Sequence, residues 1–231
     1  MSRLAVAELS KSFGGVHALR GVSFAVRAGE LLAMIGPNGA GKTTCFNLIN
    51  GQLRPDAGQI RFEGDRIDGL PTRRLCGLGI GRTFQVAATF SSMTVRENLE
   101  VVSASPEAIL NEVGISELAG RQCAELAYGD LKRVELAIAL ASRPRLLLMD
   151  EPTAGMATAE RRALMDLVGR IAKARGISVL FTEHDMDVVF AYADRVIVLA
   201  EGELIAQGTP AEVRADARVR AVYLGEEAAH A

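Results

Sequence analysis

The sequence predicts an α/β fold, in which a mainly parallel sheet is covered by helices. Three observations lead to this prediction. Strand-like segments alternate with segments of helical periodicity over most of the 231 residues. Several strand-like segments, such as residues 31–36 and 145–150, are apolar on both faces, as buried parallel strands are. A glycine-rich turn also joins residues 31–36 directly to a helix-like segment.

The amino-terminal third of the chain is strand-like, because alternating and β-branched apolar segments are separated there by glycine turns. A helix is expected from Gly41 to about Asn50. The expected strands are residues 4–9, 22–30, 31–36 and 59–64.

The second half of the chain alternates between helices and buried strands. Residues 157–175 predict a helix with one apolar face, formed by Leu164, Leu167, Val168 and Ile171. Buried strands are expected at 145–150 and 177–184, and their alternation with helices predicts a parallel sheet. Residues 195–208 predict a hairpin that turns at Glu201 and Gly202, and the tail is expected to end in a short helix and a frayed terminus.

Composition and charge narrow the class of protein. The length fits one domain with a small subdomain, and 49% of the residues are apolar, which is enough for a sizeable core. The net charge of −2, without a long basic run, gives no support to nucleic-acid binding. The sequence has three cysteines, Cys45, Cys76 and Cys123. They form neither a disulfide framework nor a zinc pattern, which indicates a reducing cytosol. We expect no secretion signal and no membrane-spanning helix.

The turn after residues 31–36 has the spacing of a phosphate-binding loop. Residues 36–43 read GPNGAGKT and match the pattern G-x-x-x-x-G-K-[ST] between a buried strand and a helix. The glycines let successive N–H groups point at one anion, and the helix adds its positive amino-terminal end. Lys42 is expected to reach the β- and γ-phosphates, and the Thr43 hydroxyl to bind Mg²⁺. The alternative is an ordinary glycine-rich turn, which the strand and helix on either side disfavour.

Two carboxylates follow a buried strand. Asp150 is suited to hold Mg²⁺, usually through a water molecule, and Glu151 is suited to orient and deprotonate an attacking water. Acids often end strands ahead of helices, so the pair becomes informative only beside the phosphate loop.

His184 and Gln85 are further candidates for the same site. His184 is expected at the end of the next strand, and the carboxyl ends of parallel strands meet at one sheet edge. Its imidazole is placed there to donate to the γ-phosphate and to hold Glu151 and the water. Gln85 is expected in a loop, where it would bind Mg²⁺ and contact the water. A structural histidine and a solvated glutamine are the alternatives.

Together these motifs resemble those of ATP-binding-cassette (ABC) ATPases over almost the whole chain. The motifs are GPNGAGKTT, Gln85, LAYGD at 126–130, LLLMDEP and His184, in the order and approximate spacing of that family. The resemblance implies a P-loop NTPase (RecA-like) core with an amino-terminal antiparallel β-subdomain and a shortened helical subdomain. Residues 1–231 would form one domain, with the core at about 1–85 and 145–231 and the helical part at about 86–144.

The resemblance also implies a complete site. ATP would be bound by Phe13, Gly36, Pro37, Asn38, Gly39, Ala40, Gly41, Lys42, Thr43 and Thr44. A second subunit, identical or not, would contact the same ATP with its own Ala127, Tyr128, Gly129 and Asp130. The catalytic residues would be Glu151, His184, Gln85 and Lys42. Mg²⁺ would be bound by Thr43, Gln85 and Asp150.

Within the family, the chain is similar to the ATP-binding subunits of branched-chain amino-acid importers, on the segments KSFGGVHALRGVSF, GIGRTFQ, SSMTVRENL, YGDLKRVELA and VYLGE. The implied partners are integral-membrane permease subunits and, indirectly, a periplasmic solute-binding protein. A groove lined by Phe84, Phe90 and Met93 would receive a permease helix at the cytoplasmic face of the inner membrane. The alternatives are lipopolysaccharide export or another solute, a soluble regulatory ABC ATPase, and a nucleotide-binding module with little catalysis.

Three features depart from the pattern of the family. LAYGD stands where LSGGQ is commoner, so Ala127 lacks the serine hydroxyl that would donate to the γ-phosphate. Gly129 and the start of a helix expected at 130–141 would remain to bind phosphate, although a site-facing Asp130 would oppose it. Ala157 replaces an acid or amide that crosses the dimer in many relatives, and residues 101–114 replace a longer helical pair.

Overall fold

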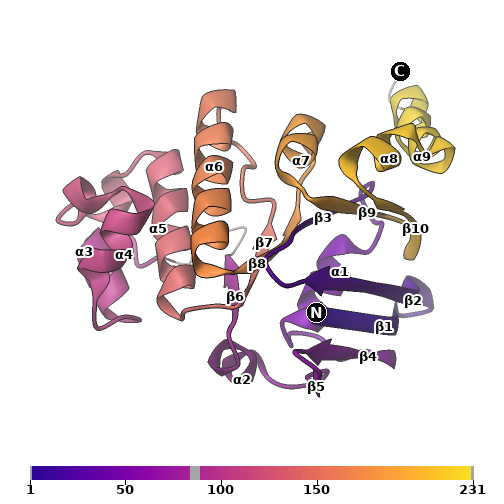
Figure 1. The fold of residues 1–231 in the computed structure, drawn as a ribbon, viewed down its shortest axis with the longest axis horizontal. Coiled ribbons are helices and arrows are strands. Elements are labelled where there is room, and N and C mark those ends of the chain that lie inside the picture. The colour runs from indigo at the N-terminus through magenta and orange to yellow at the C-terminus, as the bar shows by residue number, and fades with distance from the viewer. Residues whose placement is uncertain (1, 84–88, 230–231) are drawn as a thin grey trace.

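The fold consists of two sheets with helices between and around them. The structure is a computed structural model, and it describes residues 2–83 and 89–229. One sheet has the strand order β2-β1-β4-β5, and the other has the order β10-β9-β3-β8-β7-β6. Figure 1 shows the first sheet at one side of the molecule and α3, α4 and α5 at the other.

The smaller sheet is antiparallel and comes from the beginning of the chain. Its strands are β1 (Ser2–Phe13), β2 (Val16–Arg27), β4 (Ala57–Phe62) and β5 (Asp65–Arg66). Gly14 and Gly15 join β1 to β2, and both have positive φ angles, of 50° and 87°. Such angles suit a tight hairpin turn whose twist matches that of the strands.

The larger sheet is parallel except for its last strand. Its strands are β3 (Leu31–Ile35), β6 (Ile80–Thr83), β7 (Leu146–Asp150), β8 (Ser178–Thr182), β9 (Arg195–Ala200) and the antiparallel β10 (Glu203–Gly208). Thr182 lies beside Met34 on one side and Asp150 on the other, so the carboxyl ends of β3, β8 and β7 are level. The hairpin turn at Glu201 and Gly202 is confirmed.

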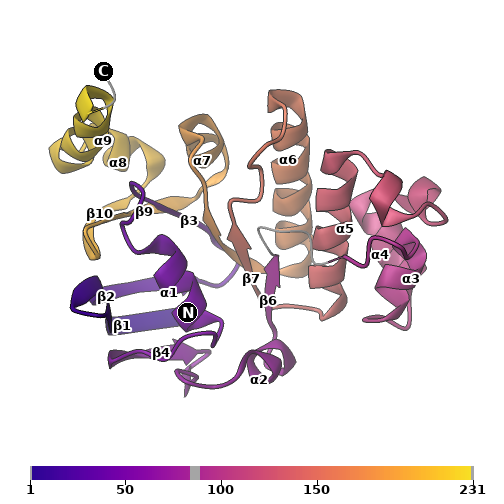
Figure 2. The ribbon, with the colours of Figure 1, turned by 180° about the vertical axis from the view of Figure 1, so that it is seen from behind.

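Helices cover both faces of the larger sheet. On one face, α1 (Lys42–Ile49) lies between the two sheets and buries Phe46 and Leu48. The helices on the other face are α6 (Thr158–Arg175), α7 (Met186–Tyr192), α8 (Pro210–Ala215) and α9 (Ala217–Ala229). Figures 1 and 2 show these four helices in a row on the side of the sheet away from α1. The α/β fold predicted from the sequence is therefore confirmed.

Short helices fill much of the chain between β4 and β7. They are α2 (Thr72–Gly77), α3 (Val95–Glu100), α4 (Pro106–Val113), α5 (Tyr128–Ala141) and the 3₁₀ turns Ser116–Leu118 and Cys123–Glu125. Thr94 caps α3, because its hydroxyl accepts from the N–H of Glu97 while the Glu97 carboxylate accepts from the N–H of Thr94. The segment 101–114 contains α4. The division of the chain into a core and a helical part at about 86–144 stays a prediction.

Several predicted boundaries are wrong by two residues or more. The strands expected at 4–9, 22–30 and 59–64 are found at Ser2–Phe13, Val16–Arg27 and Ala57–Phe62. The helix expected at 130–141 begins at Tyr128, because Tyr128 and Gly129 form its first turn. The strand expected to reach His184 ends at Thr182, because the next residues turn to start α7 at its cap, Asp185. Helix and strand ends are the least certain part of a sequence-based assignment. Within residues 2–83 and 89–229, none of the helices is long and apolar enough to cross a bilayer.

Candidate functional site

The phosphate loop (residues 36–43) connects β3 to α1 along a path that only glycine follows without strain. Gly36 has φ of 153°, and a Cβ added there would lie 2.1 Å from the carbonyl oxygen of Leu199. Gly41 has φ of 101°, and its added Cβ would lie 2.5 Å from the carbonyl oxygen of Ala18. Any side chain at either position would force the backbone to move, which explains why the loop uses glycine there.

The first turn of α1 is suited to bind an anion. Gly41 is its cap residue and has no side chain to accept from the first helical amides, and no acidic residue lies in that turn. Those N–H groups and the helix dipole favour a negatively charged ligand. Thr43 is exposed there and Thr44 is half-buried.

Lys42 places a positive charge over the phosphate loop. Its Nζ atom donates to the carbonyl oxygen of Gly36 at 2.5 Å and to that of Pro37 at 3.0 Å. The side chain lies in the loop region and not in open solvent, since the residue is 7% exposed. A compact ammonium group in this place suits the recognition of phosphate oxygens.

Asp150 ends β7 as a buried carboxylate, only 5% exposed. The Thr182 hydroxyl donates to its Oδ1 at 2.7 Å, and the Nη2 of Arg82 lies 3.4 Å from its Oδ2. Both oxygens therefore have a neighbour that holds the carboxylate in one orientation. Asp150 is level with the carboxyl end of β3, from which β8 separates it, so it lies at the same sheet edge as the phosphate loop.

Arg82 belongs to the same site, although none of the sequence motifs indicates it. Its Nη1 donates to Oδ1 of Asn47 at 3.0 Å and to Oε1 of Gln52 at 3.2 Å, in addition to the Asp150 contact. Burial lowers the pKa of Arg82, although Asp150 acts in the opposite direction. The sequence signal for Arg82 is a charged residue within the largely apolar segment before Gln85. If such a charge is buried, it usually has a charged or hydrogen-bonding partner.

Glu151 and His184 lie in direct contact. Oε1 of Glu151 is 2.8 Å from Nε2 of His184. The backbone of Glu151 has φ of 49°, a left-handed conformation that is unusual for a residue with a side chain. Its N–H group donates to the carbonyl oxygen of Thr182 at 3.2 Å and to the Thr182 hydroxyl oxygen at 3.0 Å, which fixes this turn against β8. Strained backbone of this kind is concentrated at functional sites.

Glu183, a second residue that the sequence motifs do not indicate, stabilises the loop that follows this turn. Its buried carboxylate accepts from the N–H of Thr153 at 2.8 Å and from the Thr153 hydroxyl at 2.7 Å. The bonds tie the loop after Glu151 to the end of β8. They also fix the backbone on both sides of the contact between Glu151 and His184.

The LAYGD segment forms the start of α5. Ala127 is the cap residue and makes no side-chain hydrogen bond, and Tyr128 is an exposed aromatic whose ring lies 5.4 Å from the Nζ of Lys132. A Cβ added to Gly129 would lie 3.1 Å from Oε1 of Glu160, so the segment packs closely against the start of α6. Asp130, which is half-buried, and Ala127 line a pocket of about 250 Å³ between these two helix ends.

The remaining predicted residues lie at the surface or outside the described residues. Phe13 is exposed at the end of β1, with the Nζ of Lys11 at 5.5 Å from its ring centre. Phe90 is 58% exposed and Met93 is half-buried, so Phe90 is not part of the core. Gln85 and Phe84 lie outside the described residues.

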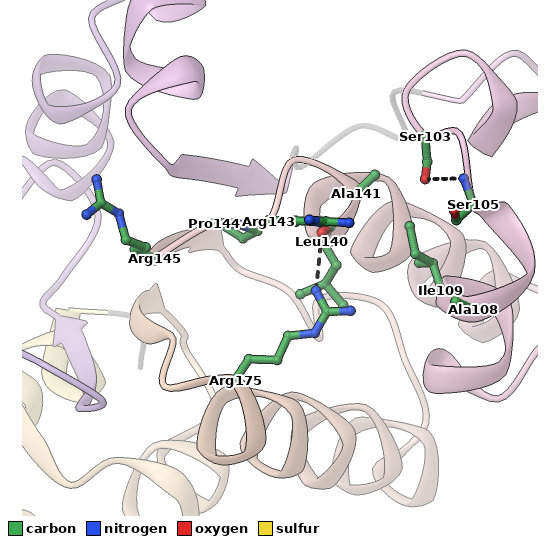
Figure 3. A pocket seen from close by; sticks show the side chains of 10 residues that line it. All are labelled: Ser103, Ser105, Ala108, Ile109, Leu140, Ala141, Arg143, Pro144, Arg145 and Arg175. Carbon is green, nitrogen blue, oxygen red and sulfur yellow. Dashed lines mark hydrogen bonds between the residues drawn. The ribbon is translucent and has the colours of Figure 1, made fainter.

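A separate pocket of about 470 Å³ lies at the beginning of β7, the opposite end of that strand from Asp150. Figure 3 shows its three arginines, which point in different directions. Arg175 donates to the carbonyl oxygen of Leu140 and forms an ion pair with Glu112, and Arg145 forms one with Glu63. These two charges therefore connect neighbouring elements.

The site has the donors that a magnesium–nucleotide complex needs. A shaped loop of glycines, an uncapped helix start and a lysine suit phosphate groups. The hydroxyl of Thr43 and the carboxylate of Asp150 are oxygen ligands of the kind that Mg²⁺ prefers, and Mg²⁺ usually takes its other ligands from water and phosphate. The residues present fit both groups.

Comparisons with known sequences agree with this site. The family model described as ABC transporter matches residues 19–154, and the model described as branched-chain amino acid ATP-binding cassette transporter matches residues 203–229. The chain is 37% identical to the high-affinity branched-chain amino acid transport ATP-binding protein BraF of Pseudomonas aeruginosa, over 98% of this chain and 100% of that protein. It is 37% identical to LivG of Salmonella typhimurium, over 96% and 98%. The lipopolysaccharide export ATP-binding protein LptB of Haemophilus influenzae is 34% identical, over 98% and 99%.

Solved structures show the same likeness. The ADP conformation of MJ1267, an ATP-binding cassette of an ABC transporter, superposes with a TM-score of 0.92 at 34% identity, over 97% of this chain and 99% of that one. The agreement confirms the fold class predicted from the sequence.

Proposed function

This chain belongs to the ATP-binding-cassette (ABC) family of transporter ATPases, and we propose from that premise that it energises the import of branched-chain or related amino acids. The relatives named for that transport and the match of residues 203–229 to the branched-chain family model support the choice of solute. The match extends over nearly the full length of those relatives.

ATP binding is assigned to the phosphate loop. The backbone N–H groups at the start of α1 and the Lys42 ammonium would hold the β- and γ-phosphates. Phe13, exposed at the end of β1, would stack on the adenine. Thr43 and Asp150 would hold Mg²⁺, which neutralises phosphate charge when bound.

Hydrolysis is assigned to Glu151. Its carboxylate would accept a proton from a water molecule as that water attacks the γ-phosphorus, and the bond to ADP would break. The neighbouring Nε2 of His184, at 2.8 Å, would hold this carboxylate in place. Glu183 and Thr182 would keep the backbone of the turn rigid, so that little reorganisation is needed during the reaction.

A second subunit would complete the site. The start of its α5, at Ala127 to Asp130, would approach the γ-phosphate held by the first subunit. Since Ala127 has no hydroxyl, this contact would rely on the N–H groups near Gly129 and on the helix dipole. Hydrolysis would remove the γ-phosphate and let the two subunits separate.

The exposed apolar residues beside α3 are the proposed contact with the permease. Phe90 precedes α3, Val101 and Val102 follow it, and all three are exposed. Exposed large apolar side chains support an interaction with another protein. A permease segment bound at this place would hold the protein at the cytoplasmic face of the membrane. A periplasmic solute-binding protein would act on the far side of that permease.

The observation that carries the proposal is the contact between Glu151 and His184 at the sheet edge that also bears the phosphate loop. The experiment is reconstitution of this chain with its permease subunits in proteoliposomes that contain the solute-binding protein. We expect ATP-dependent uptake of leucine, isoleucine or valine, and its loss in Lys42→Ala. ATP hydrolysis that responds only to lipopolysaccharide and its export partners would overturn the choice of solute.

A further inference from the structure

Arg82 lies between the nucleotide-binding edge and an apolar groove. The groove has a volume of about 370 Å³ and lies between α2, β6 and α5. Apart from Arg82 its wall is largely apolar, and it includes Leu75, Ile80, Val102, Ile138 and Ala139. Arg82 therefore lines the groove, and its guanidinium also lies 3.4 Å from the carboxylate proposed to hold Mg²⁺.

The strand register explains how Arg82 reaches both places. Arg82 is the register partner of Leu148 on β7, and Asp150 is two residues further along. Side chains two residues apart share a sheet face, so Arg82 and Asp150 are diagonal neighbours on the face that α1 covers. Asn47, which also accepts from Arg82, is one helical turn beyond Thr43 in α1. Arg82 thus contacts Asp150 directly and is also hydrogen-bonded to the helix that carries Thr43.

The guanidinium group and a metal ion would meet at the same carboxylate. Asp150 has one oxygen bound by the Thr182 hydroxyl and the other facing Arg82 at 3.4 Å. A divalent cation near this carboxylate would repel a guanidinium at that distance, and the repulsion is strong where water is largely excluded. The Asp150 side chain is 6% exposed and the Arg82 side chain 13% exposed.

Arg82 has other acceptors to which it can turn. Nη1 already donates to Asn47 at 3.0 Å and to Gln52 at 3.2 Å, and both distances are shorter than the contact with Asp150. The guanidinium can therefore leave Asp150 and keep hydrogen bonds on the side of α1. Such a movement would change the wall of the groove, which Arg82 lines.

We propose that Arg82 is a positioning residue that competes with Mg²⁺ for Asp150, so that binding of Mg²⁺ and ATP moves its guanidinium and alters the groove. The inference rests on the proposed assignment of Asp150 to Mg²⁺. Coupling of this kind acts in both directions, so a partner that fixes Arg82 in the groove would change the affinity of the site for Mg²⁺.

The test follows the binding of a fluorescent ATP analogue over a series of Mg²⁺ concentrations. The quantity measured is the Mg²⁺ concentration that gives half-saturation. Arg82→Met removes the competing charge and keeps most of the side-chain length. We expect its half-saturating Mg²⁺ concentration to fall at least about threefold, because one opposing charge is removed. Arg82→Lys keeps a charge and should remain within about twofold of the unmodified protein. Arg143→Met, an exposed arginine just before β7 and therefore at the opposite end of that strand from Asp150, is the matched control.

An opposite result is expected when the other acceptors of Arg82 are removed. In the double variant Asn47→Ala, Gln52→Ala the guanidinium has fewer alternatives to Asp150, so half-saturation should need more Mg²⁺. This variant tests the proposal even if Arg82→Met does not fold. An unchanged or weaker Mg²⁺ affinity in folded Arg82→Met would overturn the proposal, as would an unchanged affinity in the double variant. Absence of nucleotide binding in the unmodified protein would instead contradict the proposed function.

Discussion

Nε2 of His184 lies 2.8 Å from Oε1 of Glu151, although the two residues come from different loops. The turn at Glu151 is held by Thr182 and the loop behind it by Glu183, so the contact is built on fixed backbone. The imidazole is half-exposed, and His184 follows the carboxyl end of β8, at the sheet edge that also bears the phosphate loop. A carboxylate held in this manner is placed for proton transfer from water.

Replacing His184 by alanine should slow ATP hydrolysis without abolishing ATP binding. Glu151 would lose the group that orients it, and positioned proton transfer contributes about 10²–10⁴-fold to a rate. We expect a fall in kcat of about 100-fold or more with nucleotide affinity nearly unchanged. Steady-state phosphate release and fluorescent nucleotide binding measure the two quantities. A His184→Ala protein with full activity would show that this contact does not position Glu151.

Introducing a hydroxyl at Ala127 should strengthen the ATP-bound dimer. In the variant Ala127→Ser the new hydroxyl would donate to the γ-phosphate of the opposite site, and one hydrogen bond contributes about 0.5–1.5 kcal/mol. Each new bond should tighten the dimer by about two- to tenfold, and a dimer of two variant chains gains one at each site, while ATP binding by the monomer stays the same. Sedimentation of the hydrolysis-deficient protein with ATP measures this. Equal dimer affinities would show that the missing hydroxyl is unimportant.

The three cysteines should differ in reactivity. Burial raises the pKa of the Cys45 thiol to about 12, and burial also raises the pKa of Cys123, whereas Cys76 is exposed. Alkylation proceeds through the thiolate, so at pH 8 only Cys76 should react quickly in the folded protein. Mass spectrometry after iodoacetamide treatment should find one modified cysteine, and all of them after denaturation. Rapid labelling of Cys45 in the folded state would contradict its burial.

Asp185 should stabilise the fold in a pH-dependent way. Burial acts to raise the pKa of Asp185, but the hydrogen bonds from the N–H of Val188 and from Arg161 outweigh it and hold the pKa below its usual value. A lowered pKa means that the folded state favours the charged form, so this stabilisation is complete above the ordinary pKa of aspartate and is lost as the pH falls.

The variant Asp185→Ala tests this contribution. It should lower the free energy of unfolding by about 1–2 kcal/mol at neutral pH, since the cap of α7 is lost with the ion pair. Urea denaturation of both proteins from pH 7 to pH 3 should show the difference shrinking below about pH 4. A constant difference across this range would exclude the charge of Asp185 as the cause.

Features set by local pattern could be predicted from the sequence. The phosphate loop follows from glycine spacing between a strand and a helix, and the hairpin follows from Glu201 and Gly202, whose φ angles are 47° and 80°. The helix at 158–175 follows from its apolar periodicity, which the structure confirms by burying Leu164 and Ile171. Each of these signals is contained within a few neighbouring residues.

Features that join distant segments could not be predicted in the same way. Arg82 meets Asn47 and Asp150, and Glu183 meets Thr153, only because the strand order brings them together. Periodicity does not reveal such partners. Gln85 lies outside the described residues, so its contact with Mg²⁺ and water stays a prediction. The roles of the other site residues also stay predictions, although their places are now known.

The variant Glu151→Gln is the decisive test of Glu151 as the catalytic base, because it removes the base and keeps the shape of the side chain. The measurement combines phosphate release with ATP binding and sedimentation at the same Mg²⁺ concentration. We expect hydrolysis to be abolished, while ATP is still bound and the protein accumulates as an ATP-bound dimer. Hydrolysis at the rate of the unmodified protein would contradict the assignment of Glu151 as the base that activates water.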